Sequence, residues 1–341
     1  MEVRTLERNE EDLWGNYILA LKSSNFFCQI GWRNVVQKTY RLKPFYLVAY
    51  DKAVVKGVLP LFIMKSVFFG KRLISIPFGP FGGIYTADKN AKESLLLKAK
   101  KLTEEKKLDY LELRFPYLPD IDLPQHKYFF TMEVELDENP DVVWKKLDKK
   151  VRNSTRKAIK SGLSVTIDRR YLEDFYHLYA LNMWEVGTPV HKYAFFKNLL
   201  GEFPDKVQMA TVHHENKIIA SMILLSFKET VISGWAASDK RYLNMSPNNI
   251  LYWETIKYCC ENDYKYFDFG RSMEGSGTYN FKMKWATVPK QLFYIYYLNR
   301  ISEIPKLDPS NPKYEKSIRK WKKMPFWVTK LFGPMIRKNL P

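Results

Sequence analysis

The sequence predicts a mixed α/β protein made of two related domains, and three observations support this fold class. The chain has 341 residues, enough for two domains at about 150 residues each. Hydrophobic residues make up 46% and aromatic residues 16%, which excludes a disordered or low-complexity protein. The order strand, turn, strand, irregular segment, helix, strand occurs twice. We therefore expect a mixed sheet flanked by helices in each half.

The elements of this repeat follow from hydrophobic periodicity. In the first half we expect a helix at Glu10–Leu21, strands at Phe45–Ala49 and Val54–Met64, a helix at Lys89–Lys106 and a strand at Tyr110–Phe115. The Pro- and Gly-rich stretch Ser75–Gly83 predicts a loop. In the second half we expect strands at Val207–Val212 and Lys217–Ser226, a helix at Pro247–Glu261 and a strand at Tyr266–Phe269.

Residues 139–162, between the two halves, are predicted to form one basic amphipathic helix. Asn139-Pro140 is typical of a helix start and Gly162 of a helix end. The polar face carries Lys145, Lys146, Lys149, Lys150, Arg152, Arg156, Lys157 and Lys160. Because Lys and Arg bind phosphates by charge-assisted hydrogen bonds, this face is a candidate anion-binding surface. The alternative is an ordinary solvated helix face.

The C-terminal segment, residues 313–341, combines basic and large apolar side chains. Val328, Leu331, Phe332, Met335 and Ile336 recur at helical spacing, and Glu315 is the single acidic residue. This composition is typical of a helix that lies on an anionic membrane surface. The alternative is a helix that packs its apolar face on the second domain.

Composition excludes several classes of protein. The three cysteines include the neighbours Cys259 and Cys260 and form no Cys-x-x-Cys, so we expect neither a disulfide framework nor a metal site. We find no apolar run long enough for a membrane span and no signal-peptide core, and we therefore expect a cytoplasmic protein. The net charge of +18 indicates polyanionic partners such as nucleic acid, anionic lipid or phosphorylated ligands, and the alternative is that the lysines only form solvated faces.

The segment 268–285 (Asp-Phe-Gly-Arg-Ser-Met-Glu-Gly-Ser-Gly-Thr-Tyr-Asn-Phe-Lys-Met-Lys-Trp) is the densest candidate site. A predicted strand ends in a Gly-rich loop here, and ligands of open α/β sheets bind beyond the carboxyl ends of strands. Arg271, Ser272 and Lys282 supply hydrogen-bond donors, while Asp268 is an acidic candidate. The aromatic residues Tyr279, Phe281 and Trp285 are either substrate contacts or core, since alternating aromatics also describe a strand.

This segment resembles the C-terminal signature of the FemAB-like family, which includes peptidoglycan bridge-forming aminoacyltransferases and GNAT-like relatives. The resemblance extends from about Phe26 onward and includes Arg152-Asn-Ser-Thr-Arg156, Gly187-Thr-Pro-Val-His191 and Asn248-Asn-Ile-Leu-Tyr-Trp253. It implies two tandem GNAT-like domains. We place the first at residues 1–138, the second with its basic helix at 139–300, and a basic tail at 301–341.

The resemblance implies transfer of an aminoacyl or acyl group to an amine of a cell-envelope precursor. The co-substrate would be aminoacyl-tRNA or acyl-CoA, with no tightly bound cofactor. Lys282 matches the family's lysine that is thought to stabilise the reacting carbonyl or a nearby phosphate, as a fixed cation can. Arg271 and Asp268 are the further catalytic candidates. The substrate-binding candidates are Ser272, Tyr279, Phe281, Trp285, His191, Arg152 and Arg156.

The sequence departs from the family pattern in two places. Ala286 stands where many relatives have Gly, and we find no long heptad segment for the coiled-coil arm of some tRNA-using members. Two other functions therefore stay open. One is an acyl-CoA-dependent acetyltransferase acting on a sugar, peptide or small amine. The other is a non-catalytic basic protein that binds the inner face of the membrane through residues 313–341.

Overall fold

The computed structural model describes residues 1–66, 70–305 and 312–340, and these residues form two compact units. Unit 1 comprises residues 1–128, 291–305 and 338–340, and unit 2 comprises 129–290 and 312–337. Part of the predicted tail, residues 306–311 and 341, lies outside the described chain. Within the described chain, no helix is both long and apolar enough to span a bilayer.

Unit 1 is built on a mixed sheet with the strand order β1-β2-β3-β4-β5-β15-β6. Its strands are β1 (Glu2–Thr5), β2 (Lys43–Asp51), β3 (Val54–Ser66), β4 (Gly70–Ile74), β5 (Tyr110–Phe115), β6 (Gln125–His126) and β15 (Phe293–Leu298). Its helices are α1 (Glu11–Ala20), α2 (Ile30–Tyr40) and α3 (Lys89–Glu105). The strands pair antiparallel except β4 and β5, which run parallel because α3 connects them.

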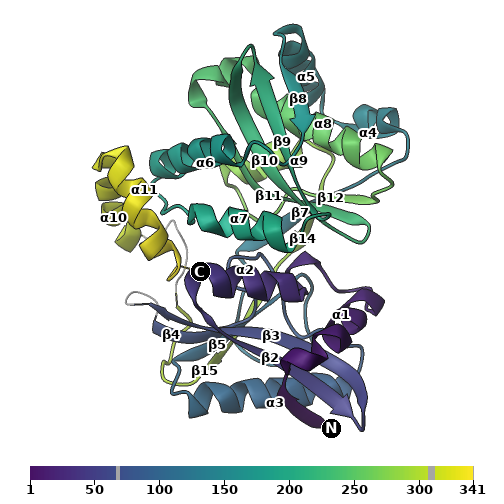
Figure 1. Cartoon of the computed structure of the whole chain (residues 1–341), viewed down its shortest axis with the longest axis vertical. Helices are drawn as coiled ribbons and strands as arrows, with labels where there is room; N and C mark the ends of the chain where they lie inside the picture. The colour runs from purple at the N-terminus through teal and green to yellow at the C-terminus, as the bar shows by residue number, and fades with distance from the viewer. Residues whose placement is uncertain (67–69, 306–311, 341) are drawn as a thin grey trace. The chain divides into compact units, whose positions relative to one another are not determined.

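Helices cover both faces of this sheet (Figure 1). On one face, Leu95 and Ala99 of α3 pack on Leu61 and Leu111 of the strands. The Asp88 side chain accepts a hydrogen bond from the Ala91 N–H and caps the start of α3. On the other face, α1 and α2 bring aromatic residues to the sheet, and the ring of Trp14 lies 4.7 Å from that of Tyr46.

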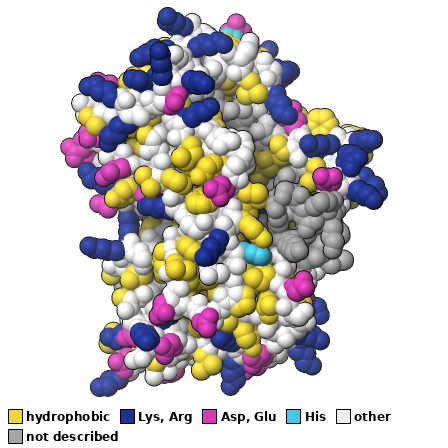
Figure 2. Space-filling view, turned by 180° about the vertical axis from the view of Figure 1, so that it is seen from behind, with side chains coloured by type: hydrophobic (Ala, Val, Ile, Leu, Met, Phe, Trp, Pro, Cys, Tyr) yellow, Lys and Arg dark blue, Asp and Glu magenta, His cyan; other side chains and the backbone are white. Residues whose placement is uncertain are grey.

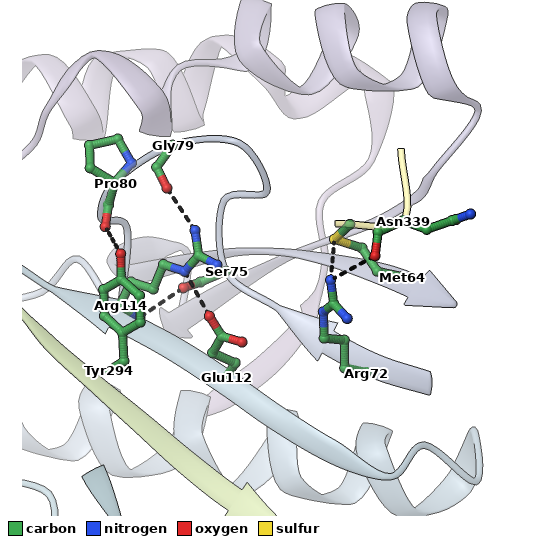
Figure 3. Close-up of polar contacts among 9 residues, drawn as sticks. All are labelled: Met64, Arg72, Ser75, Gly79, Pro80, Glu112, Arg114, Tyr294 and Asn339. Atoms are coloured by element: carbon green, nitrogen blue, oxygen red, sulfur yellow. Dashed lines mark hydrogen bonds and ion pairs between the residues drawn. The ribbon is translucent and has the colours of Figure 1, made fainter. Parts of the chain in front are cut away.

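The Pro- and Gly-rich stretch 75–83 is a loop, as predicted, and polar contacts fasten it to β5 (Figure 3). Arg114 pairs with Glu112 at 2.8 Å, and its other guanidinium nitrogen donates to the Gly79 carbonyl at 2.8 Å. The Tyr294 hydroxyl donates to the Pro80 carbonyl. Both charged side chains of the ion pair are buried within β5, and the hydrogen bonds to the Gly79 and Pro80 carbonyls hold the loop against the sheet.

Unit 2 has a second mixed sheet with the order β13-β7-β12-β11-β10-β9-β8, and β14 also pairs with β7. Its strands are β7 (Phe129–Glu135), β8 (Ser164–Ile167), β9 (Val207–His214), β10 (Lys217–Phe227), β11 (Thr230–Ser238), β12 (Tyr266–Asp268), β13 (Ser272–Met273) and β14 (Val288–Gln291). The helix α8 (Pro247–Glu261) connects the parallel strands β11 and β12, as α3 connects β4 and β5. The predicted repeat of elements is thus present in both units.

The remaining helices of unit 2 lie beside its sheet, except for the last two, which pack on another helix (Figure 1). They are α4 (Pro140–Lys146), α5 (Lys149–Lys160), α6 (Leu172–Val186), α7 (Tyr193–Glu202), α9 (Gly277–Met283), α10 (Pro312–Lys323) and α11 (Phe326–Arg337). The helices α5 and α8 pack together, with Val151, Ala158 and Leu251 in a core that includes Met222 of β10. The helix α6 lies against β10 and β11, and α10 and α11 pack on α6.

The structure corrects the predicted single helix at 139–162. Leu147 is extended (φ −69°, ψ 148°), and the Asp148 side chain accepts a hydrogen bond from the Lys150 N–H, so a second helix begins there. A capping residue inside a periodic pattern therefore splits one predicted helix into α4 and α5. Gly162, with φ +73°, follows the end of α5 as expected.

The units also differ from the predicted domain ranges 1–138 and 139–300. β7 pairs with β12 and β13 of unit 2, although residues 129–135 precede the predicted boundary. β15 pairs with β5 of unit 1, although residues 293–298 follow the whole of the second repeat. Local periodicity predicts that a strand exists but does not identify its partner, which explains both differences.

Candidate functional site

A bulge in β11 marks the position of the candidate site in unit 2. Ile223 of β10 pairs with Trp235, whereas the next residue, Leu224, pairs with Ser233, so Gly234 is the extra residue. Bulges bend a strand and are frequent beside active sites. The parallel pairing of β11 with β12 ends at Ile232–Asp268, although β11 itself continues to Ser238. The two strands therefore diverge at this end of the sheet.

Asp268, the last residue of β12, is buried at the point of divergence. Its carboxylate accepts a hydrogen bond from the Thr131 hydroxyl at 2.6 Å and from the Gly270 N–H at 2.8 Å. Burial raises the pKa of Asp268, and these two hydrogen bonds oppose that shift. The carboxylate thus holds the turn that follows β12, and Gly270 adopts the left-handed conformation (φ +75°) that this turn requires.

Lys282 reaches the same turn from the helix α9. The Ser276 side chain caps this helix by accepting a hydrogen bond from the Tyr279 N–H. The Lys282 Nζ donates to the Gly270 carbonyl at 2.9 Å and lies 3.4 Å from the Arg271 carbonyl. An ammonium group has three donors, so one N–H remains for a ligand.

The electrostatic setting of Lys282 follows from its burial. The side chain is only 8% exposed, and this desolvation lowers its pKa to about 8. The charge of Asp268 acts in the opposite direction, whereas the nearby Arg271 adds to the lowering. The lysine is therefore mainly protonated at neutral pH, and it is held as a fixed cation at the end of β12.

Arg271 and Ser272 occupy the stretch directly after this turn. The Arg271 guanidinium lies 4.5 Å from the ring centre of Phe129, and the side chain is exposed. Ser272 is buried in β13, where it pairs with Phe130, and its hydroxyl has no hydrogen-bond partner among the described residues. The structure thus brings Asp268, Arg271, Ser272 and Lys282 together.

The three aromatic candidates do not form a strand, because residues 277–283 are helical. Tyr279 is half-buried, with its ring 5.7 Å from that of Phe130. Phe281 packs against the core of unit 2, and Trp285 is fully buried within it. The structure therefore places Trp285 beneath the site rather than on its surface.

Ala286 is one of the two departures from the family pattern, and the structure shows its effect on the backbone. It adopts φ +58°, the left-handed region in which glycine is favoured because a Cβ is strained there. The glycine of many relatives would fit this backbone without strain. The turn after Trp285 is therefore strained in this chain.

His191 lies apart from the signature turn, in an aromatic cluster. Its ring stacks on Phe195 at 4.5 Å and lies 6.0 Å from Trp235 of β11. The Arg337 Nε donates to the His191 Nε2 at 3.1 Å, so this nitrogen is unprotonated. Burial and the Arg337 charge lower the pKa of His191 well below its usual value. The histidine is a neutral, buried support for the C-terminal helix.

The basic candidates Arg152 and Arg156 lie on α5. The Arg156 guanidinium is exposed, 5.5 Å from the ring centre of Trp144, whereas Arg152 is half-buried. The Asp148 N–H donates to the Lys284 carbonyl at 3.1 Å. The first turn of the basic helix thus adjoins the end of the helix that carries Lys282.

Sequence reasoning missed three residues that shape the site: Thr131, Gly234 and Arg337. Thr131 and Arg337 act through contacts with residues far away in the sequence, and no local pattern identifies them. Gly234 interrupts the apolar run of β11, and a glycine inside a strand pattern is a recognised sign of a bulge.

The equivalent position in unit 1 is occupied by the chain itself. β4 and β5 also pair through three residue pairs, ending at Ile74–Glu112. Beyond them, the Ser75 N–H donates to the Glu112 carbonyl and the Gly82 N–H to the Arg114 carbonyl, both at 2.9 Å. The loop 75–83 thus pairs with β5 beyond the last β4–β5 residue pair of unit 1.

Comparison with known proteins agrees with this geometry. A family model described as an acetyltransferase (GNAT) domain matches residues 145–283, from the end of α4 to the residue after Lys282. No curated protein matches the sequence.

Three solved structures share the fold. FemX has a TM-score of 0.66 at 15% identity, covering 88% of this chain and 98% of FemX. The C-terminal domain of a protein assigned as a lysylphosphatidylglycerol synthetase, from Agrobacterium fabrum, has a TM-score of 0.57 at 10% identity, covering 84% and 91%. A tandem GNAT protein from the clavulanic acid biosynthesis pathway has a TM-score of 0.54 at 11% identity, covering 89% and 99%.

The predicted resemblance to the FemAB-like family is therefore confirmed at the level of the fold. Residues 145–283 match an acetyltransferase (GNAT) domain model, and the chain as a whole shares the mixed α/β fold of a tandem GNAT protein.

Proposed function

We propose that the chain is an N-acyltransferase that binds the activated acyl group of its donor where β11 and β12 diverge in unit 2. One observation carries this proposal. Within the acetyltransferase domain, pairing of the two strands ends at Ile232–Asp268, and the turn held by Lys282 lies at that point. The backbone of β11 beyond Ile232 can pair with amide groups of an extended ligand, as free strand edges do.

The chemistry assigned to this site is acyl transfer. The neutral amine of the acceptor adds to the acyl carbonyl and forms a C–N bond, which moves an electron pair onto the carbonyl oxygen. The remaining N–H of Lys282 donates to that oxyanion. When the oxyanion collapses, the bond to the leaving group breaks, and the amine proton leaves with the departing thiolate or alkoxide.

We propose acyl-CoA as the donor, because the domain that holds the site is of the acetyltransferase type. Aminoacyl-tRNA is the second candidate, and the basic face of α5 favours it. This face presents exposed lysines and arginines, and its helix adjoins the end of α9 through the bond between Asp148 and Lys284. A phosphate backbone would complement that charge.

We propose an amine of a cell-envelope precursor as the acceptor, with the protein acting at the cytoplasmic face of the membrane. The support is the fold shared with FemX and with a domain assigned as a lysylphosphatidylglycerol synthetase, whose name describes aminoacylation of a lipid. The FemAB-like resemblance of the sequence points to the same class of acceptor.

A donor assay tests this function. The purified chain would be mixed with membranes and precursor extract and supplied separately with acyl-CoA pools and charged tRNA pools. Mass spectrometry would then search for new amides. We expect a CoA-dependent amide that survives RNase and is lost in Lys282→Ala. RNase-sensitive transfer would replace acyl-CoA by aminoacyl-tRNA as the donor.

Two outcomes would contradict the proposal as a whole. One is the absence of any new amide with either donor pool. The other is full transfer by a variant in which Lys282 and Arg271 are both replaced, which would show that neither side chain takes part in the reaction.

A further inference from the structure

The buried side of the helix α11, which belongs to unit 2 together with α10, consists of small residues. Thr329, Gly333 and Pro334 form the buried side of α11. A Cβ on Gly333 would lie 3.1 Å from the Val190 Cγ1, so the helix approaches its neighbour closely because this residue is glycine. The fully buried residues of α11 are therefore small, while Phe326 at its start contacts the rings of His177 and Trp184.

Several polar and ring contacts fix these helices in place. The Trp184 Nε1 of α6 donates to the Met324 carbonyl at 2.9 Å, and Trp321 is buried. At the far end of α11, Arg337 is bonded to the buried His191. The pair is thus held at its middle and at its end, and the outward face of α11 is a defined surface.

That outward face consists of large apolar side chains. Trp327 is 67% exposed, Leu331 61%, Met335 60% and Phe332 48%. They recur every three or four residues and so share one side of the helix. A helix on a globular protein ordinarily turns its large apolar residues inward, and a contiguous exposed patch of this kind marks an interaction surface.

The same two helices also carry many exposed basic residues, most of them on α10. The exposed members are Lys316, Arg319, Lys320, Lys322, Lys323 and Lys330. Figure 2 shows the Lys and Arg side chains of α10 gathered at the right-hand edge of the view. Glu315 is the single acidic residue of the two helices, and it lies 3.9 Å from Arg319.

We propose that α10 and α11 together dock on an anionic lipid surface. Trp327, Leu331, Phe332 and Met335 enter the boundary between headgroups and acyl chains, and the exposed lysines and arginines contact lipid phosphates. A second copy of the chain fits this face poorly, because association would bring two strongly basic surfaces together. A bilayer with anionic headgroups complements the basic charge of the two helices, and its acyl chains complement their apolar face.

This inference goes beyond acyl transfer and does not depend on it. If both proposals hold, docking brings the acetyltransferase domain to acceptors that are embedded in the bilayer. Because the test measures binding alone, its failure leaves the transfer assay unaffected.

The experiment compares co-sedimentation of the full chain with vesicles of phosphatidylcholine alone and with vesicles that also contain phosphatidylglycerol. We expect binding to the second kind only, and a marked loss of binding at high salt. The paired changes Trp327→Ser and Leu331→Ser should lower the bound fraction tenfold or more. The paired changes Lys320→Glu and Lys323→Glu should do so as well.

The matched control is Leu97→Ser, because Leu97 on α3 is 69% exposed and lies in unit 1. This variant should bind as the parent does. Equal sedimentation of the parent with both kinds of vesicle, or undiminished binding by the Trp327/Leu331 variant, would overturn the proposal. A third outcome would also overturn it: the parent does not bind vesicles but forms a dimer in light scattering, and the Trp327/Leu331 variant is a monomer.

Discussion

The Nζ of Lys282 donates a hydrogen bond to the carbonyl of Gly270 at 2.9 Å, and this contact joins the helix α9 to the turn after β12. The same turn receives the Asp268 carboxylate, which accepts from the Gly270 N–H. A single peptide segment is therefore held from both sides by groups of opposite charge. The position of the Lys282 ammonium group depends on this turn.

Replacing Lys282 by Ala is expected to abolish acyl transfer while the fold is retained. Loss of a donor to a developing oxyanion lowers kcat by roughly 10²–10³. The measurement is single-turnover transfer, with circular dichroism as a check of the fold. Lys284→Ala is the matched control, because Lys284 is exposed and lies two residues further on. Equal losses in both variants would remove Lys282 from the mechanism.

The lowered pKa of Lys282 predicts a pH-dependent stability. Between about pH 8, the pKa in the folded chain, and about 10.5, its usual value, only the unfolded chain holds this proton. Because the unfolded state then binds more protons, the free energy of unfolding should rise with pH across this interval. The rise attributable to Lys282 is on the order of 3 kcal/mol.

Urea denaturation of the parent and of Lys282→Met at several pH values measures this effect. The variant should lack the rise, and other titrating groups cancel in the difference. Parallel stability curves for the two proteins would show that the lysine is not desolvated in solution.

Two glycines of the signature loop allow the backbone strain of a positive φ to be separated from the steric clash of an added Cβ. Gly270 and Gly275 both have positive φ, +75° and +74°. A Cβ on Gly270 would lie 3.0 Å from the Ser233 carbonyl oxygen, whereas one on Gly275 would meet nothing within 4 Å. Gly275→Ala should lower the free energy of unfolding by about 1 kcal/mol through backbone strain. Gly270→Ala should lower it further and also reduce transfer, because the acceptor of Lys282 moves.

Ala286→Gly is expected to stabilise the chain, in contrast to most changes to glycine. The residue has φ +58°, and the strain removed exceeds the entropy that glycine adds to the unfolded state. We expect a gain of about 0.5 kcal/mol in thermal or urea unfolding. Ala158→Gly, in the last turn of α5, should instead destabilise by about 1 kcal/mol. The interpretation fails if both variants lose stability equally.

Most elements were predictable from the sequence because they depend on local patterns. The period of 3.6 residues identified α3 and α8, and runs of β-branched residues identified β3 and β10. What local patterns leave open is the partner of a strand, which explains why β7 and β15 lie in units other than those predicted. The continuous apolar stripe of residues 139–162 favours a single helix, whereas capping by Asp148 starts a new one. The structure has the two helices.

The candidate site was predictable in part for the same reason. Asp268, Arg271, Ser272 and Lys282 lie within a short stretch of sequence, so the fold had only to bend that stretch to bring them together. Thr131 is 137 residues away from Asp268, and its role appears only when β7 and β12 lie side by side. His191 was predicted as a substrate-binding residue, whereas the structure places it in a buried aromatic cluster beside Arg337, a neighbour that could be found only in three dimensions.

The return of β15 to the sheet of unit 1 has a consequence for synthesis of the protein on the ribosome. The strand β5 lies between β4 and β15. β15 (residues 293–298) is synthesised only after all of β7 to β14. At a translation rate of roughly 5–20 residues per second, this edge of β5 remains unpaired for on the order of ten seconds or more. Unit 2 can therefore complete its sheet first, although it is second in the sequence, and the N-terminal half is the part of the nascent chain that most needs protection from aggregation.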